Sequence, residues 1–184
     1  MDRIKARQQL DIRNCFSVLS VGRLLPIKGI DILLQIAREH PDWNFIFVGT
    51  GSLENKLRQA ESDFDNVSFF GSQSNEKLPV FYNAADVLVV PSQYEEGFGR
   101  VIIEAMSCGC PVIASRRGGI VEALSFGGGD LVEINQRAIV NALSRYNNLQ
   151  INRDNIVEIA QKYFSNANAR AILETIRKFT EQVR

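Results

Sequence analysis

Apolar residues recur along this chain in short blocks, and each block is followed by a loop that contains glycine. Five blocks have the length and the β-branched or aromatic content of buried strands, and residues 131–132 are expected to add a short sixth. Between the blocks, apolar residues such as Ile30, Leu33 and Leu34 follow the spacing of one helix face. The five longer predicted strands are residues 16–21, 44–48, 67–70, 87–90 and 112–114.

The alternation of strands and helices predicts an α/β fold with a parallel sheet, because parallel neighbours need crossover connections. We expect a three-layer, Rossmann-like, doubly wound sheet of about six strands within one domain of residues 1–184. Ser74 is the expected N-cap of the helix after the third strand. Residues 136–184 are predicted to be a helical tail that ends in a helix at 165–184. Residues 1–14 lack a sustained apolar period, which predicts a linker or a frayed helix.

Composition and charge exclude several functional classes. The chain is 45% hydrophobic and 23% charged, with 21 basic and 21 acidic residues. A formal net charge of zero provides no basic field to hold a nucleic acid or an anionic membrane unaided. The longest apolar runs have strand length, so no membrane span is expected. The charged residues 1–14 also lack the apolar core of a secretory signal, and we expect a cytoplasmic location.

The three cysteines, Cys15, Cys108 and Cys110, do not resemble a disulfide framework. Cys108 and Cys110 could form a metal or redox pair, but the one histidine, His40, is far from them in the sequence. Buried, reduced thiols are the favoured interpretation.

Ligands of parallel sheets bind outside the carboxyl ends of the strands, so the two edges of the predicted sheet have different meanings. Glycine occurs in every loop expected at the carboxyl edge, and most phosphate-compatible side chains lie there too. The opposite edge carries His40, several aspartates and the cysteine pair. The expected carboxyl-edge loops are residues 22–28, 49–52, 71–74, 91–99 and 115–119.

The segment 91–111 is the most informative part of the sequence. Gly97-Phe98-Gly99 opens a predicted helix, and a helix start with free N–H groups suits a phosphate. Glu96 precedes this helix and Glu104 lies on it, with seven residues between them. Carboxylates beside an anion site suit a ligand rich in hydroxyls, which indicates a nucleotide-sugar.

Arg23 and Lys28 follow the first strand and could grip a phosphate. The alternative is that both are solvated loop residues, and Glu96 and Glu104 could likewise be surface acids. Glu104 stands among apolar residues, where an unpaired carboxylate is costly, and this favours contact with a ligand. Glu95 is the less favoured of the two adjacent acids.

Two other sites are considered and set aside. Asp63 and Asp65 could hold a divalent metal, but they precede a strand and therefore lie at the wrong edge. Gly49 and Gly51 suggest a dinucleotide motif, but Glu54 stands where its third glycine belongs. These glycines are expected instead to let the backbone approach a ligand or to cap a helix.

Six motifs in the correct order resemble one family: VGRLLPIKG, FVGTG, VSFFG, YNAAD with the VPS that follows its strand, EEGFGRVIIEAMSCGCPVIAS and RGGIVE. Together they look like the C-terminal, donor-binding domain of retaining, nucleotide-sugar-dependent glycosyltransferases of the two-domain GT-B type, in the glycosyl transferases group 1 family. The resemblance is strong over residues 16–125 and weak in the helical tail.

The resemblance implies a role for each matching position. Arg23 and Lys28 would bind the donor diphosphate and stabilise the leaving group, and Glu104 would bind the ribose hydroxyls. Glu96 would contact the sugar and is, with Arg23 and Lys28, a candidate catalytic residue. The remaining implied nucleotide-sugar contacts are Gly22, Gly49, Gly51, Phe70, Gly71, Leu78, Gly97, Phe98 and Gly99. The family implies no metal and no cofactor beyond a UDP-, GDP- or ADP-sugar donor.

The sequence departs from the family in two ways. Nothing matches the N-terminal acceptor domain, so the chain would be an excised domain, a fragmentary product or one half of a split enzyme. It would then have little activity alone, and any peripheral attachment to the inner face of the membrane would come through the missing half. Arg116 and Arg117 stand where smaller or acidic residues are usual, and could meet the donor, the missing domain or water. A nucleotide-sugar epimerase and a non-enzymatic binding subunit are the alternative functions.

Overall fold

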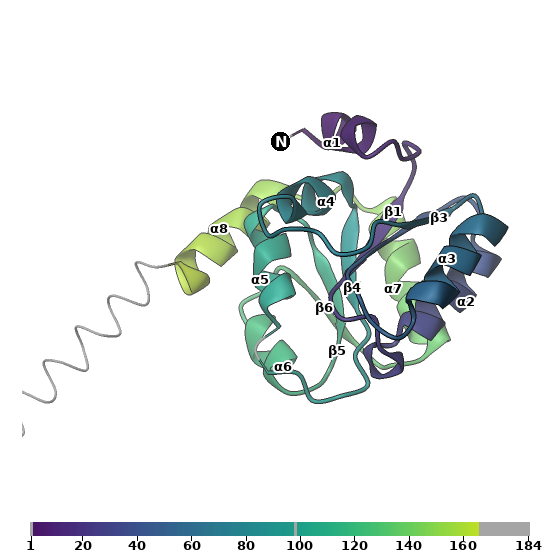
Figure 1. Ribbon diagram of the computed structural model, residues 1–184. Coiled ribbons are helices and arrows are strands. Elements are labelled where there is room, and N and C mark those ends of the chain that lie inside the picture. The colour runs from purple at the N-terminus through teal and green to yellow at the C-terminus, as the bar shows by residue number, and fades with distance from the viewer. Residues whose placement is uncertain (1, 98, 166–184) are drawn as a thin grey trace, which may run out of the picture.

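The computed structural model describes residues 2–97 and 99–165 of the chain. Six strands form one parallel sheet in the order β3-β2-β1-β4-β5-β6 (Figure 1). This arrangement confirms the predicted doubly wound α/β fold. The strands are β1 (Ser17–Val21), β2 (Asn44–Val48), β3 (Val67–Phe69), β4 (Val87–Val90), β5 (Val112–Ser115) and β6 (Gly129–Val132).

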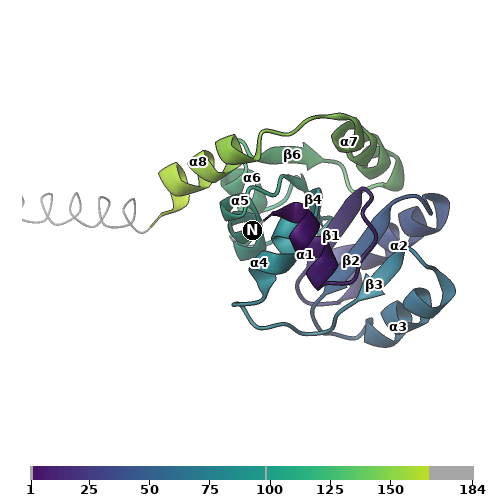
Figure 2. The same cartoon turned by 90° about the horizontal axis from the view of Figure 1, so that it is seen from above.

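Helices cover both faces of the sheet and make the predicted three layers (Figure 2). One face carries α2 (Ile30–Glu39), α3 (Glu54–Asp63) and α7 (Gln136–Asn148). The other face carries α4 (Leu78–Ala84), α5 (Arg100–Ser107), α6 (Gly119–Ala123) and α8 (Arg153–Phe164).

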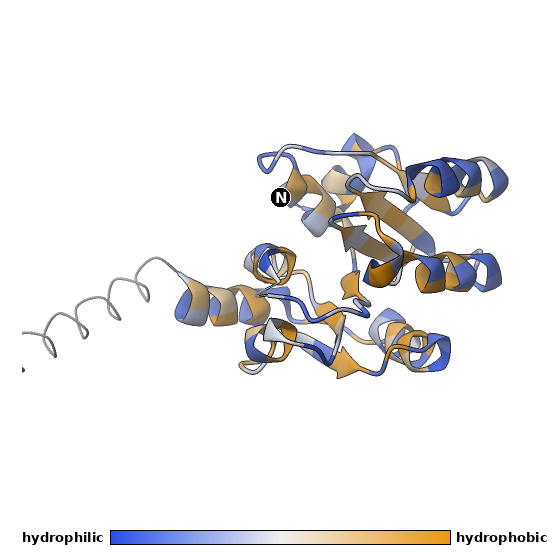
Figure 3. Cartoon of the chain, turned by 60° about the horizontal axis from the view of Figure 1, so that its bottom comes forward, coloured by the Kyte–Doolittle hydropathy of each residue, from blue (hydrophilic) through white to orange (hydrophobic). Residues whose placement is uncertain are grey.

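The central strands are buried on both faces, which explains their largely apolar sequences. Every residue of β2 is buried, and its alternate side chains enter the two separate cores. Phe45 and Phe47 pack under α2 and α3, whereas Ile46 and Val48 pack on the opposite face. The hydropathy colouring shows the same division, with apolar strands and helices that are polar on their outer sides (Figure 3).

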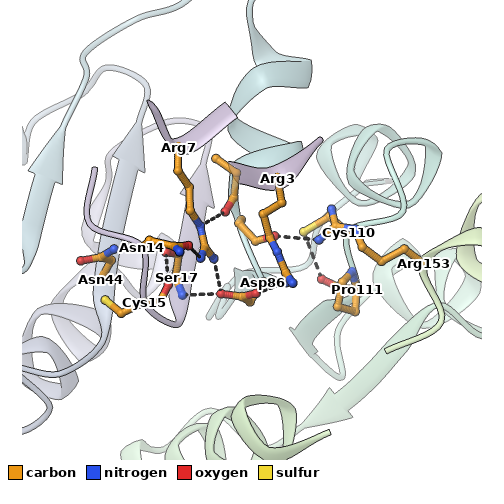
Figure 4. Close-up of polar contacts among 12 residues, drawn as sticks. Arg3, Arg7, Asn14, Cys15, Ser17, Asn44, Asp86, Cys110, Pro111 and Arg153 are labelled. Carbon is orange, nitrogen blue, oxygen red and sulfur yellow. Dashed lines mark hydrogen bonds and ion pairs between the residues drawn. The ribbon is translucent and has the colours of Figure 1, made fainter. Parts of the chain in front are cut away.

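The N-terminal segment differs from the predicted linker or frayed helix. Residues Arg3–Gln9 form helix α1, whose N-cap Asp2 accepts hydrogen bonds from two backbone N–H groups. Buried Arg7 donates to Asp86 at 2.5 Å and to the Ala84 carbonyl at 2.9 Å, and Arg3 also pairs with Asp86 (Figure 4). Polar anchors hold α1 in place together with the buried Ala6 and the flanking Leu10 and Ile12, too few apolar positions to give a periodic signal.

The predicted Ser74 N-cap is wrong. Helix α4 begins at Leu78, after a turn in which the Lys77 N–H donates to the Ser74 carbonyl. Pro79 lies in the first turn of α4, where its missing N–H costs nothing, and it fixes the helical start.

The predicted continuous helical tail is interrupted. Residues 149–152 separate α7 from α8, and the Asn152 side chain caps α8 by accepting from the Asn155 N–H at 3.1 Å. Residues 166–184, and with them the predicted final helix, lie outside the described residues. In the part of the chain that is described, no helix combines the length and apolar character required to cross a membrane.

The order of the strands reverses between β1 and β4, because the chain moves outward from β1 in one direction and returns to β4 on the other side. The loops that leave the carboxyl ends of these two strands therefore diverge and leave a crevice. Such a switch point is where ligands bind in this class of fold.

Candidate functional site

A cavity of about 280 Å³ opens at the switch point between β1 and β4. The loop after β1 supplies Gly22 and Arg23, and a short 3₁₀ turn, η1 (Pro26–Lys28), supplies Lys28. The loop after β4 supplies Glu96 and Gly97 from the other side. The structure thus brings together the residues predicted to bind the diphosphate and the sugar.

A second cavity of about 320 Å³ adjoins the first. It is lined by Glu104, Leu78 and Gly49, all predicted site residues, together with residues of the turn after β3. The two cavities share five lining residues, so one extended ligand could lie across both. The shared residues are Val21, Gly22, Arg23, Arg100 and Val101.

Helix α5 begins between the two cavities. Its N-cap is Gly99, in the left-handed conformation at φ 65° and ψ 54°, and no side-chain hydrogen bond caps it. Arg100 and Val101, the first two helical residues, line both cavities. The first N–H groups of a helix have no partner within it, so an anion in this crevice would meet them and the positive end of the dipole.

Glu96 is held from two sides. Lys28 forms an ion pair with its Oε1 atom, and the buried Ser92 hydroxyl donates to the same atom at 2.6 Å. Burial opposes ionisation, but the Lys28 and Ser92 hydrogen bonds and the nearby positive charges outweigh it and hold the pKa of Glu96 below its ordinary value. Glu96 is therefore an anionic acceptor at neutral pH.

Arg23 differs from Lys28 in its side-chain contacts. Within the described residues its guanidinium makes no hydrogen bond or ion pair, although it lines both cavities. Its charge contributes to the lowered pKa of Glu96, so it lies close enough to influence the site. Five N–H donors at the junction of the two cavities are thus available to an anionic ligand.

Glu104 is not the unpaired carboxylate that its apolar neighbours in the sequence suggested. The Tyr82 hydroxyl donates to Glu104 Oε2 at 2.9 Å, and Arg100 lies 3.5 Å from Oε1. Burial and the Glu104 charge raise the pKa of Tyr82 well above its ordinary value, so this phenol remains a donor.

The glycines after β1 and β2 serve different purposes. A Cβ on Gly22 would meet no atom within 4 Å, so the backbone there is open to a ligand. A Cβ on Gly49 would lie 1.8 Å from the Gly22 carbonyl oxygen, and one on Gly51 would lie 2.4 Å from the Leu24 carbonyl oxygen. Gly51 lines neither cavity. Loop–loop packing explains why both positions are glycine, and of the two only Gly49 also lines the second cavity, where a ligand could approach it.

The turn expected to border a nucleobase is only partly at the cavity. Leu78 lines the second cavity, but Phe70 and Gly71 do not. The Phe70 ring packs edge-to-face on Phe81 at 5.0 Å, and the Gln73 side chain donates to the Phe70 carbonyl at 2.7 Å. The residues after the turn take that place: Ser72, Gln73 and Asn75. Phe98 lies outside the described residues.

Comparison with known proteins identifies the family. The model of the family "Glycosyl transferases group 1" matches residues 2–163. The chain belongs to this family. It is 37% identical over 133 residues to a D-inositol 3-phosphate glycosyltransferase of Mycobacteroides abscessus, a match that covers 67% of this chain and 30% of the relative.

Solved structures of other proteins share the fold of this chain. Sucrose-phosphate synthase of Thermosynechococcus elongatus superposes with a TM-score of 0.81 at 32% identity, covering 98% of this chain and 50% of the other. The Anabaena protein HepE in complex with UDP superposes with a TM-score of 0.79 at 29% identity, covering 95% and 52%. The chain therefore spans about half the length of these proteins.

The histidine, the aspartates and the cysteine pair lie at the opposite edge of the sheet, as the sequence indicated. Among residues 2–97 and 99–165, no three His, Cys, Asp or Glu side chains are grouped to hold a metal ion. His40 stacks on Trp43, with 4.1 Å between the ring centroids, and the Asp63 carboxylate accepts from Gln59 at 2.8 Å. Cys110 is fully buried, which raises the pKa of its thiol to about 12, while the free Cys15 and Cys108 are only partly buried.

A neighbouring loop fixes the loop that carries Glu96. The Gly119 N–H donates to the Glu96 carbonyl at 2.9 Å, and a Cβ on Gly118 would lie 2.3 Å from that carbonyl oxygen. Arg117 lies 3.8 Å from Glu95, an exposed pair on the outer side of the same contact. The Gly118-Gly119 segment thus holds the backbone of the loop that carries Glu96.

We expect Gly118→Ala to lower the free energy of unfolding by about 1–3 kcal/mol, because its backbone (φ 49°, ψ −139°) is closed to other residues and the added methyl meets the Glu96 carbonyl. Gly97→Ala is the matched control, since a Cβ there meets no atom within 4 Å. Urea unfolding of the ligand-free protein measures both. Equal stability of the two variants would contradict the close contact at Gly118.

Proposed function

We propose that this domain binds a nucleoside diphosphate-sugar and acts as the donor half of a retaining glycosyltransferase. The observation that supports this most is the convergence of Arg23, Lys28, Glu96 and the open start of α5 on one cavity at the switch point. The adjoining cavity with Glu104 has the acceptor groups for ribose hydroxyls. HepE, in the complexes named for it, binds UDP and UDP-glucose.

The residues suggest how the donor would react. When the bond between the sugar C1 and the diphosphate oxygen breaks, the leaving group takes the electron pair and gains negative charge. Arg23, Lys28 and the start of α5 would stabilise that charge in place, as preorganised dipoles and cations do. The Lys28 ammonium has three donors, so it can keep its bond to Glu96 and still reach a phosphate.

The acceptor half is part of the proposal as well. The sugar would pass to a hydroxyl held by an N-terminal acceptor domain, on another part of the protein or on a partner chain. The domain alone would then bind donor and turn over little. No metal or cofactor is proposed, since two cations and a helix start face the diphosphate site.

An epimerase on the same scaffold receives no support from the cavity. Such an enzyme needs its own acid and base at the sugar, and among the described lining residues of the first cavity Glu96 is the one acid.

We expect calorimetry and thermal shift to detect binding of one of UDP, GDP or ADP, and of its glucose ester, to the domain. At a ligand concentration 100-fold above the Kd, binding stabilises the folded state by about 2.7 kcal/mol, a shift that thermal unfolding resolves. No binding of any of the three at millimolar concentration would overturn the proposed function.

A further inference from the structure

Each of the two site carboxylates receives a hydrogen bond from a buried hydroxyl that lines neither cavity. Ser92 is completely buried directly after β4 and donates to Glu96. Tyr82 is 1% exposed on α4 and donates to Glu104. Neither residue is among the site residues predicted from the sequence.

Each hydroxyl binds one oxygen of its carboxylate and leaves the other oxygen without a hydrogen bond to a described residue. Ser92 and Lys28 both donate to Glu96 Oε1, and within the described residues Glu96 Oε2 has no hydrogen-bond partner. Tyr82 donates to Glu104 Oε2, while Oε1 has only the 3.5 Å contact with Arg100. A carboxylate fixed through one oxygen can accept from a ligand hydroxyl through the other.

Both donors stand on rigid parts of the fold. The Gln93 N–H, next to Ser92, donates to the Ile27 carbonyl at 2.7 Å. On the other side of Ser92, the backbone of Gly29 approaches Pro91 so closely that a Cβ would lie 2.2 Å from the Pro91 carbonyl oxygen. The Tyr82 ring is packed in the core on the face of the sheet that carries α4 and α5. Supports of this kind keep a functional side chain within a fraction of an ångström of its working position.

We propose that Ser92 and Tyr82 are positioning residues, which orient Glu96 toward the sugar and Glu104 toward the ribose of the donor. This inference rests on the proposed function. It assigns the two hydroxyls to different halves of one ligand, and so it predicts two different patterns of binding.

Comparing UDP with UDP-glucose separates contacts to the nucleotide from contacts to the sugar. If the domain prefers GDP or ADP in the binding panel, that nucleotide and its glucose ester are used instead. Ser92→Ala lowers the affinity for UDP-glucose about fivefold to tenfold and leaves that for UDP within twofold, because only the sugar meets Glu96. Tyr82→Phe lowers both affinities by about the same factor, because both ligands carry the ribose. Calorimetry at pH 7 measures the affinity of each variant relative to the wild type for each of the two ligands.

The pH dependence distinguishes positioning from simple packing. A hydroxyl that donates to Glu96 favours its charged form, so Ser92→Ala raises the pKa of Glu96. As the pH falls, the ratio of UDP-glucose to UDP affinity therefore declines at a higher pH in Ser92→Ala than in the wild type. Tyr82→Phe keeps the wild-type profile of this ratio, and Ser92→Thr, which retains the hydroxyl, restores the profile toward wild type.

Ser115→Ala is the matched control, because Ser115 is also completely buried and its hydroxyl has no hydrogen-bond partner within the described residues. We expect it to leave both affinities unchanged. If the wild type binds the nucleotides but Ser92→Ala weakens UDP and UDP-glucose equally, or changes neither, the inference is wrong while the proposed function stands. Failure of the wild type to bind any nucleotide overturns both. Urea unfolding of each variant confirms that the affinities refer to folded protein.

Discussion

The double substitution Arg23→Gln and Lys28→Gln lowers the affinity for the preferred nucleoside diphosphate by about 100-fold or more. Each charge-assisted hydrogen bond to a phosphate is worth about 1.5–3 kcal/mol, and Arg23, without a partner in the described part of the chain, is free to make two. Calorimetry at fixed, moderate ionic strength measures the loss, since salt screens part of the attraction.

The matched control for this pair is Arg116→Gln with Arg117→Gln. It removes the same charge from the same edge of the sheet, where Arg117 meets Glu95 at 3.8 Å and lines neither cavity. We expect a change of less than threefold. An equal loss in both double variants would mean that the overall field of this edge, and not direct contact, attracts the ligand.

Asp86→Asn lowers the free energy of unfolding by about 3–5 kcal/mol, because it leaves the buried Arg7 guanidinium without its charged partner. Asp86 also pairs with Arg3 and accepts from the Ser17 N–H at 2.8 Å, so one carboxylate joins α1 to the start of two strands (Figure 4). A loss of this size is a large fraction of the stability of a typical domain. Urea unfolding measures it.

Asp31→Asn provides the comparison for Asp86. Asp31 pairs with Lys56 at 2.6 Å, but both side chains are about half exposed, and we expect a change within about 1 kcal/mol. Similar losses in the two variants would show that the contacts of α1 contribute little to the stability of the domain.

The sequence predicted the sheet and the edge that holds the site because both follow from local patterns. Buried strands contain continuous apolar blocks such as residues 45–48, and the loops that follow them carry glycine and charge. Alternation of strands and helices then places Arg23, Lys28 and Glu96 at one edge, whatever the details of packing. The structure brings them to one cavity, as this logic requires.

What the sequence did not predict depends on contacts between distant elements. Arg7 meets Asp86 across 79 positions, and Tyr82 meets Glu104 across 22, so neither pair leaves a periodic signal. The ion pair of Lys28 with Glu96 joins two residues that were predicted to bind different parts of the ligand. Arg100, four positions before Glu104 at a helical spacing, was the one missed residue that a local rule could have found.

The contact between Gly49 and the Gly22 carbonyl has a consequence for redesign of donor preference. The loop after β2 cannot acquire a side chain at position 49 unless the Gly22 backbone retreats, since an added methyl on Gly49 would lie 1.8 Å from that oxygen. The loops after β1 and β2 should therefore be exchanged together. A chimera that imports only the loop after β2 will collide with the Gly22 carbonyl wherever the imported loop has a side chain at the position of Gly49, whereas exchange of both loops together can keep the crevice intact.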